Sequence, residues 1–453
     1  KVAYTNHFTL NTPKVDTETV KPTKDIFPQD KFIPLYQILT VVNKYTNFIN
    51  SLEHWNIKYI KRKPSMKIFF AGIIGYGCNL GIRKTAKISK HITHNELENT
   101  VNWYFTIDNL NNANNKIIAL IDKMKISKIF KRNKNISHTS SDGQKFSVGV
   151  ESLNANYSFK YFGKGKGVTV YSFIDECHKL FHSTVISSSV REATYVIDGL
   201  MQNEVVKSDI HSTDTHGYNE LIFGICHLLG ISFAPRIKNF PDQYIYAFDH
   251  VKKLKEKGYQ ILPQKRIQIE NIEPYWDDIL RFVATIKLKH STASQLFKRL
   301  SAYSIQHPFY KALKEFGKIF KSIFLLQYID DVELRQMIEK QLNKLESSNK
   351  FRKAVFHGNN QEFQQASKEE QLIADTCSRL IQNAIICWNY LYISQKICDF
   401  KSESEREEFI EILKNKSIVT WQHINMLGEF NFSENFKSDI TFELPKLLEL
   451  NNL

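Results

Sequence analysis

The sequence lacks the features that stabilise small secreted domains or anchor a chain in a membrane. No Cys-x-x-Cys motif is present, and the six cysteines are scattered: Cys78, Cys177, Cys226, Cys377, Cys387 and Cys398. They are therefore predicted to be free thiols of a reducing compartment rather than a disulfide framework. The most apolar stretch, residues 68–78, is too short to span a bilayer, and no secretory signal opens the chain. These absences predict a cytoplasmic protein with no membrane partner.

An excess of basic residues is the main compositional feature. The 453 residues include 61 Lys and Arg against 47 Asp and Glu, a net charge of +14. This excess predicts a phosphate-rich or otherwise anionic partner. The length allows about two to four domains with a full core. Because the chain starts at Lys1 without a methionine, we expect it to be the C-terminal part of a longer protein.

Hydrophobic periodicity divides the chain into a helical first part and a strand-rich middle. Residues 1–30 are polar and contain three prolines, which predicts an extended linker. Residues 31–135 have mainly helical spacing. The pattern changes at SSDGQKFSVGV, because residues 136–241 alternate short apolar runs with polar or glycine-rich connections.

The order of elements within residues 136–241 indicates the fold. Three strand-like runs, predicted to be antiparallel neighbours, come first at 143–150, 155–163 and 167–175. A helix (191–202), a strand (205–213), a helix (219–230) and a strand (231–237) follow. This order matches a ribonuclease H-like α/β fold, whose mixed sheet joins an antiparallel hairpin system to parallel strands.

The rest of the chain is predicted to be helical. Residues 242–335 are interpreted as a large helical insertion, and residues 336–395 as the second part of the ribonuclease H-like core. Residues 396–453 are interpreted as a C-terminal helical region. Because a fold alone does not determine function, the functional prediction depends on the acidic residues.

Acids at strand ends predict a metal-dependent reaction on phosphodiesters. Such phosphoryl transfer needs two or three carboxylates, since hard divalent cations prefer oxygen ligands. Asp142 opens the first strand-like run and Asp214 ends the fourth, and in the fold above these ends lie side by side. Glu346, from a later helical segment, fits as a third acid.

Spacing alone does not select these three among 47 acids. Asp175 also ends a strand-like run, and Asp198 and Asp209 lie nearby. Asp214 is equally suited to cap the next helix, a position that Asp favours. The residues by themselves leave these alternatives open.

Several long motifs recur in one order along the chain. SSDGQKFSVGVESLNANYS, REATYVIDGL and STDTHGYNELIFGICHLLGISFAPRIKNF are followed by LNKLESSNKFRKAVFHGN, LIQNAIICWNYLYIS and VTWQHINMLGEF, and preceded by GYGCNLGI. Together they resemble the DDE transposases of class II replicative bacterial transposons, the Tn-three family. The resemblance covers about residues 76 to 430.

This resemblance implies a catalytic role for Asp142, Asp214 and Glu346 as ligands of two Mg²⁺ ions, which Mn²⁺ can replace. It implies nicking at each transposon 3′ end, transfer of that end to target DNA, and a replicative, cointegrate-forming route. Gln144 lies in the first motif. His216 lies in the second and either orients a phosphate or a metal-bound water, or packs at the helix start. The motif around Glu346 departs from the family, because Leu345 replaces the usual glycine.

The expected partner is double-stranded DNA, both the terminal inverted repeats and the target, bound by a homodimer that associates with the nucleoid. Arg236, Lys238 and Arg191 are predicted to contact phosphate. Lys164 and Lys166 are predicted to face DNA from a hairpin turn, since YFGKGKGVTV lacks the ending of a nucleotide-binding loop.

Three other interpretations compete with this one. Cys177, His178 and His182 resemble a zinc cluster but lack a fourth ligand, so no zinc site is expected. A stand-alone nuclease would use the same acids. A non-catalytic, DNA-binding remnant of a decayed transposon would keep the basic surface, and the altered motif at Glu346 is compatible with it.

Overall fold

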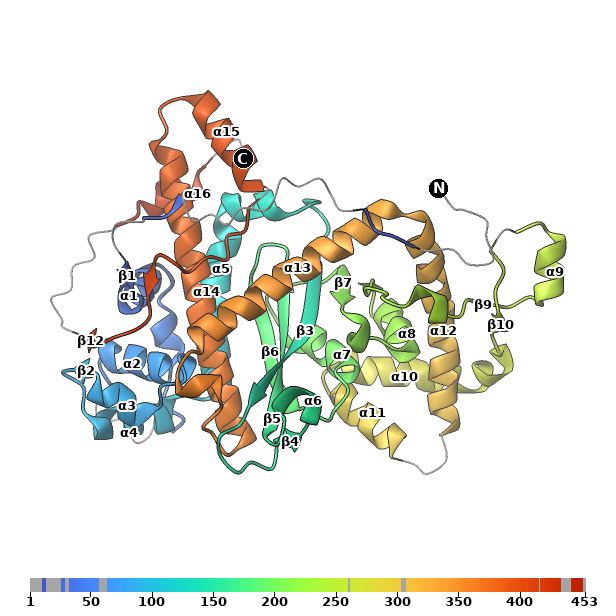
Figure 1. Cartoon of the computed structure of the whole chain (residues 1–453), viewed down its shortest axis with the longest axis horizontal. Helices are drawn as coiled ribbons and strands as arrows, with labels where there is room; N and C mark the ends of the chain where they lie inside the picture. The colour runs from blue at the N-terminus through green and yellow to red at the C-terminus, as the bar shows by residue number, and fades with distance from the viewer. Residues whose placement is uncertain are drawn as a thin grey trace. The chain divides into compact units, whose positions relative to one another are not determined.

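The structure is a computed structural model, which describes residues 10–13, 26–28, 32–56, 63–259, 261–302, 307–414, 416–432 and 441–450. Most of the predicted linker, residues 1–30, lies outside these ranges. The chain folds into two units (Figure 1). The first is built mainly from Ile136–Asp142 and Arg191–Asn343, and the second from Glu18–Asn135, Gly143–Val190 and Lys344–Leu453. The predicted core region 136–241 is therefore divided between them.

Parallel strands form the sheet of the first unit. The start of β3 (His138–Ser147) pairs with β7 (Ile210–Thr213), and β7 pairs with β8 (Ser232–Phe233). The helix α7 (Ala193–Gln202) precedes β7, and α8 (Glu220–Leu228) connects β7 to β8. Such a helical crossover is what a parallel pair requires, because a tight turn cannot join parallel strands. The predicted helix–strand–helix–strand order of this region is present.

Helices make up most of the rest of the first unit. They are α9 (Val251–Glu256), α10 (Trp276–Lys287), α11 (Ala293–Ser301), α12 (Pro308–Asp330) and the start of α13 (Val332–Val355). A short parallel pair, β9 (Tyr246–Ala247) with β10 (Lys265–Arg266), interrupts the predicted helical insertion.

Helix α12 packs closely against α8. A Cβ added to Gly317 of α12 would lie 1.7 Å from the backbone oxygen of Glu220. Glycine at this position therefore sets how closely the two helix backbones approach.

Antiparallel strands form the sheet of the second unit. The central strand β5 (Lys166–Asp175) pairs with β4 (Asn156–Tyr157) and β6 (Leu180–Ser187), and β3, which continues into this unit, is also its neighbour. The strand predicted at 155–163 is present only as β4, because the chain then forms the single turn α6 (Phe159–Phe162). Strand β6 was missed because its apolar residues come in adjacent pairs instead of alternating.

The long helix α14 (Lys368–Asp399), whose middle turns are buried on all sides, packs against α1 (Leu35–Thr46), α2 (Met66–Gly77), α5 (Ile107–Lys123) and α16 (Leu444–Leu448). This unit also contains α3 (Ile82–Lys87), α4 (His94–Tyr104), α15 (Glu403–Lys414) and the end of α13. Short parallel pairs join β1 (Ile33–Pro34) to β11 (Ile424–Asn425) and β2 (Ser89–Lys90) to β12 (Phe430–Asn431). Capping boxes begin α4 and α14.

The predicted α/β class is confirmed by this mixture of helices and mixed strand pairing. The finer assignment to a ribonuclease H-like fold stays a prediction. Among the helices within the described ranges, none combines the length and the apolar character needed to cross a bilayer.

Candidate active site at the ends of two parallel strands

The two aspartates of the predicted site occupy matching positions on neighbouring strands. The last register pair of β3 and β7 is Ser141 with Thr213, so Asp142 and Asp214 come next on each strand. One detail of the prediction is wrong, because β3 begins at His138 and Asp142 lies within the strand instead of opening it. The residues before Asp142 are polar, but their side chains are buried, and Thr139 and Ser141 are hydrogen-bonded.

Strand alternation places both carboxylates on one face of the sheet. Side chains two residues apart share a face, so His138, Ser140 and Asp142 lie together on β3, as Ser212 and Asp214 do on β7. His138 Nε2 lies 2.8 Å from Ser212 Oγ, which verifies that these faces coincide. Two oxygen-donor groups therefore lie on adjacent parallel strands of the first unit.

Buried hydrogen bonds hold this register on both faces. Ser212 Oγ donates a hydrogen bond to the carbonyl oxygen of Ala234 at 2.7 Å. Because a hydroxyl has one hydrogen to donate, Ser212 Oγ accepts the bond from His138 Nε2. These two hydrogen bonds connect β3 to β7, and β7 to the residue that follows β8. On the other face, His211 lies 2.8 Å from both Thr139 Oγ1 and Ser141 Oγ. Burial, followed by the effect of His138, lowers the pKa of His211 to about 3, so its ring is neutral near pH 7.

Cationic side chains surround Asp214. Its Oδ1 accepts from Arg236 Nε at 3.2 Å and Nη2 at 3.1 Å, and its Oδ2 lies 3.3 Å from Lys238 Nζ. Burial raises the pKa of Asp214, but the Thr215 N–H and the charges of Arg236 and Lys238 outweigh it, so the pKa lies below its usual value. Asp214 is therefore ionised at neutral pH.

The alternative that Asp214 caps the next α-helix is not what the structure contains. Asn219 caps α8, since its Oδ1 accepts from the N–H of Ile222 at 3.2 Å. Asp214 accepts from Thr215 at the start of the short 3-10 turn η5 (Thr215–Gly217). A one-turn cap does not need a guanidinium and an ammonium group on the same carboxylate, so capping alone does not explain this arrangement.

Helix α13 adds an acid that the sequence analysis missed. Arg236 Nη1 donates to Glu339 Oε2 at 3.1 Å, so one guanidinium bridges Asp214 and Glu339. Gln341 donates to Ser140 Oγ at 3.1 Å, which places this part of α13 over the face that carries the two aspartates. The available signal was spacing, since Glu339 precedes Glu346 by about two turns of one helix.

The other two residues of the predicted catalytic motifs, Glu346 and Gln144, lie in the second unit. Glu346 is an exposed residue of α13. Gln144 of β3 donates to the backbone oxygen of Asn349 at 2.9 Å, and so connects the strand to the helix three residues beyond Glu346. Within the described ranges, no three His, Cys, Asp or Glu side chains form a group that could hold a metal ion.

The predicted basic residues differ in what they contact. Arg236 and Lys238 bind Asp214 in this structure, whereas Arg191 and Lys164 are exposed. Lys166 forms an ion pair with Glu151 at 2.8 Å. The backbone of His216 lies in η5, but its side chain is outside the described part of the structure.

The alternative acids each have a structural partner. Asp175 is buried with Lys179, whose Nζ lies 3.0 Å away. Asp209 accepts from the backbone N–H of Ser137 at 2.9 Å. Asp198 accepts from the N–H of Ser294 at 3.1 Å and so satisfies a donor in the first turn of α11.

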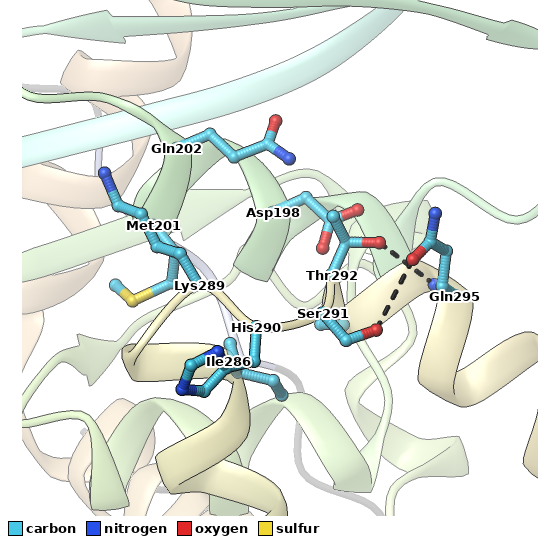
Figure 2. Close-up of a pocket in the computed structure, with 10 residues that line it drawn as sticks. Asp198, Met201, Gln202, Ile286, Lys289, His290, Ser291, Thr292 and Gln295 are labelled. Atoms are coloured by element: carbon cyan, nitrogen blue, oxygen red, sulfur yellow. Dashed lines mark hydrogen bonds between the residues drawn. The ribbon is translucent and has the colours of Figure 1, made fainter.

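Asp198 also lines a pocket of about 210 Å³ between α7 and the segment that joins α10 to α11 (Figure 2). None of the predicted site residues lines it. Cys177 and His178 are buried and His182 is half-buried, and these three residues belong to no metal-binding group among the described residues.

Comparison with known proteins gives one family. Residues 37–430 match the family described as the Tn3 transposase DDE domain. The chain is 30% identical over 420 residues to the transposase for transposon Tn1546 of Enterococcus faecium, covering 92% of this chain and 42% of that protein. It is 32% identical over 410 residues to the transposase for transposon Tn2501 of Escherichia coli, covering 88% and 40%.

A third relative, the transposase for transposon gamma-delta of Escherichia coli K12, is 26% identical over 406 residues, with coverages of 88% and 40%. The chain thus spans about two fifths of the length of these relatives. Since the family match extends over most of its 453 residues, the chain belongs to the Tn3 transposase DDE-domain family.

Proposed function

We propose that this chain carries the catalytic centre of a DNA transposase, which nicks DNA at the 3′ ends of a transposon and joins those ends to target DNA. The observation that supports it most is the pair Asp142 and Asp214, each of which directly follows a member of the last register pair, Ser141 with Thr213, of two parallel strands. The family match supports DNA as the substrate class. The strand order around the pair favours a ribonuclease H-like fold.

The donor set fits a hard divalent cation. Carboxylate oxygens are the ligands that Mg²⁺ and Mn²⁺ prefer. Asp142, Asp214 and Glu346 would hold two such ions, which when bound supply Lewis-acid polarisation of a phosphodiester and a more acidic attacking hydroxyl. Asp214, ionised at neutral pH, needs no deprotonation before it binds a cation.

The side chains around Asp214 have separate roles in this proposal. Arg236 and Lys238 form ion pairs with its carboxylate and would contact DNA phosphate if Asp214 held a cation instead. Gln144 holds β3 against the turn of α13 that follows Glu346. Water and the DNA 3′ hydroxyl are the successive nucleophiles, so no covalent intermediate with the protein is required.

Binding to DNA is assigned to basic side chains away from the carboxylates. Arg191, Lys164 and Lys166 would contact phosphate, and their removal should reduce affinity and its salt dependence together. The same proposal includes the DNA partners, which are the duplex ends of the transposon and the target duplex. It also includes a homodimer on DNA and the replicative route of transposition.

A strand-transfer assay tests this function and distinguishes a transposase from a nuclease. A duplex with a pre-cut transposon 3′ end and a labelled target plasmid is incubated with Mg²⁺ or Mn²⁺. We expect covalent joining of the end to the target, lost in Asp142→Asn, Asp214→Asn and Glu346→Gln, while gel-shift affinity persists. Nicking without any joined product would indicate a nuclease, and joining by the Asp214→Asn protein would refute the assigned site.

A further inference from the structure

The turn before β5 exposes a group of large aromatic rings. In the second unit, Tyr157, Phe159 and Tyr161 are 67%, 84% and 49% exposed. They lie at the end of β4 and on α6, beside the start of β5 (Figure 1). Single exposed apolar side chains are common, but a group of them marks a site of interaction.

The local backbone keeps these rings outside. Phe162, the last residue of α6, packs on Gly167, where an added Cβ would lie 2.3 Å from the ring. Gly163 then ends the turn with a φ of +57°, a conformation that glycine adopts readily. Because Phe162 anchors the turn to the sheet, Phe159 and Tyr161 are left facing solvent.

Lysines lie among the rings. Lys160 Nζ is 5.0 Å from the centre of the Tyr161 ring, and Lys166 Nζ is 5.2 Å from that of Tyr157. Lys164 is exposed and forms no ion pair within the described part of the chain. Residues 143–170 contain four lysines and one acid. We name this group, Tyr157, Phe159, Lys160, Tyr161, Lys164 and Lys166, the aromatic–lysine surface.

We propose that the aromatic–lysine surface binds unpaired DNA, with bases stacked on the rings and phosphates on the lysines. The positive charge fits a polyanion, and each exposed ring offers a flat face on which any base can stack. In a duplex these base faces are covered by neighbouring pairs, so the surface should favour single strands. An acidic protein would satisfy the lysines but would leave the ring of Phe159 without a flat partner.

The proposal rests on the proposed function only in taking DNA as the polyanion. Binding requires neither a metal ion nor Asp142, Asp214 or Glu346, so it is measured in EDTA. Loss of strand transfer would leave this inference intact, and loss of single-strand binding would leave the assigned catalytic acids intact.

Fluorescence anisotropy of a labelled 12-nucleotide single strand and of the matched hairpin duplex tests the proposal. Phe159→Ala should weaken single-strand binding by about 5- to 150-fold, the range expected for one lost stacking contact of about 1–3 kcal/mol, and duplex binding less than about twofold. Phe159→Trp should restore single-strand binding. Phe248→Ala, which removes a 50% exposed phenylalanine elsewhere, is the matched control and should change neither.

Lys164→Ala should weaken binding of both DNA forms and reduce the slope of log affinity against log salt by roughly 0.7 for the single strand. The matched control is Lys252→Ala, an exposed lysine of α9. Equal affinities of Phe159→Ala and wild type for the single strand would overturn the proposal. So would equal losses for single strand and duplex, or failure of Phe159→Trp to exceed Phe159→Ala.

Discussion

Arg236 should compete with divalent cations for Asp214, so its removal should tighten metal binding by the DNA-free chain. Arg236 donates two hydrogen bonds to Asp214 and one to Glu339, all between 3.1 and 3.2 Å. A cation that takes the Asp214 oxygens must displace this guanidinium. In Arg236→Gln the competing charge is absent, and Asp214 keeps a weaker partner in Lys238.

The size of the effect follows from the geometry. A hydrogen bond to a charged group contributes about 1.5–3 kcal/mol when it is buried. All three side chains are partly exposed, and solvent screening reduces such pairs towards about 1 kcal/mol or less each. Two weakened bonds therefore amount to about 1.4 kcal/mol, which corresponds to a roughly tenfold lower Kd. Glu339→Gln should instead weaken cation binding at Asp214. Arg236 then loses its ion pair with Glu339 and keeps the one with Asp214, so it competes more strongly for the Asp214 carboxylate.

Electron paramagnetic resonance measures this directly, since free Mn²⁺ gives a signal that broadens when the ion binds. Titrations would compare wild type, Arg236→Gln and Arg281→Gln without DNA. Arg281 is a suitable control because it forms an ion pair with Asp278 at the surface of α10 and its side chain is 78% exposed. An unchanged or weaker Mn²⁺ affinity in folded Arg236→Gln would refute the competition.

Three further substitutions test the packing and electrostatics of the fold. Gly317→Ala should lower the free energy of unfolding by about 1–3 kcal/mol in urea titrations, because the new Cβ meets the backbone oxygen of Glu220. A higher free energy of unfolding for Gly317→Ala would contradict the close approach of the two helices. Asp375→Ala should cost about 3–5 kcal/mol, since it leaves the buried Arg352 unpaired, and Asp375→Leu combined with Arg352→Met should recover most of it. His211, with a folded pKa of about 3 against an unfolded 6.5, contributes stability that is complete above pH 6.5 and is lost as the pH falls towards 3. His211→Asn should therefore remove up to about 1.4 kcal/mol per pH unit of that acid slope, and an unchanged slope would contradict its buried, neutral state.

The sequence was informative where local pattern and chain order determine structure. The apolar helix α8 between two short strands predicts a parallel crossover, and this crossover brings the end of β7 beside β3. Asp142 and Asp214 could be paired from that order together with their motifs. Residues that lack alternation were less predictable, because the paired apolar residues of β6 and the single turn α6 are stabilised by packing across the sheet.

Contacts between distant residues could not be read from the sequence. Arg236 and Glu339 are 103 residues apart, and nothing in either segment specifies that one guanidinium joins them. The hydrogen bonds from His138 to Ser212 and from Ser212 to Ala234 could not be predicted either, because each of these residues is an ordinary polar or small residue in its own segment. Basic residues near an acid predicted DNA contact, whereas in the DNA-free chain Arg236 and Lys238 bind the acid itself.

The most direct test of the assigned centre is metal rescue of Asp214→Cys in nicking of a supercoiled plasmid that carries transposon ends. A thiolate binds Mg²⁺ poorly but binds softer ions such as Mn²⁺ or Cd²⁺ better. If Asp214 holds the ion that supports phosphoryl transfer, Asp214→Cys should be inactive in Mg²⁺ and recover nicking in Mn²⁺ or Cd²⁺, whereas Asp214→Ala should stay inactive in all three. Nicking by Asp214→Cys in Mg²⁺ at the wild-type rate would show that Asp214 is not a metal ligand.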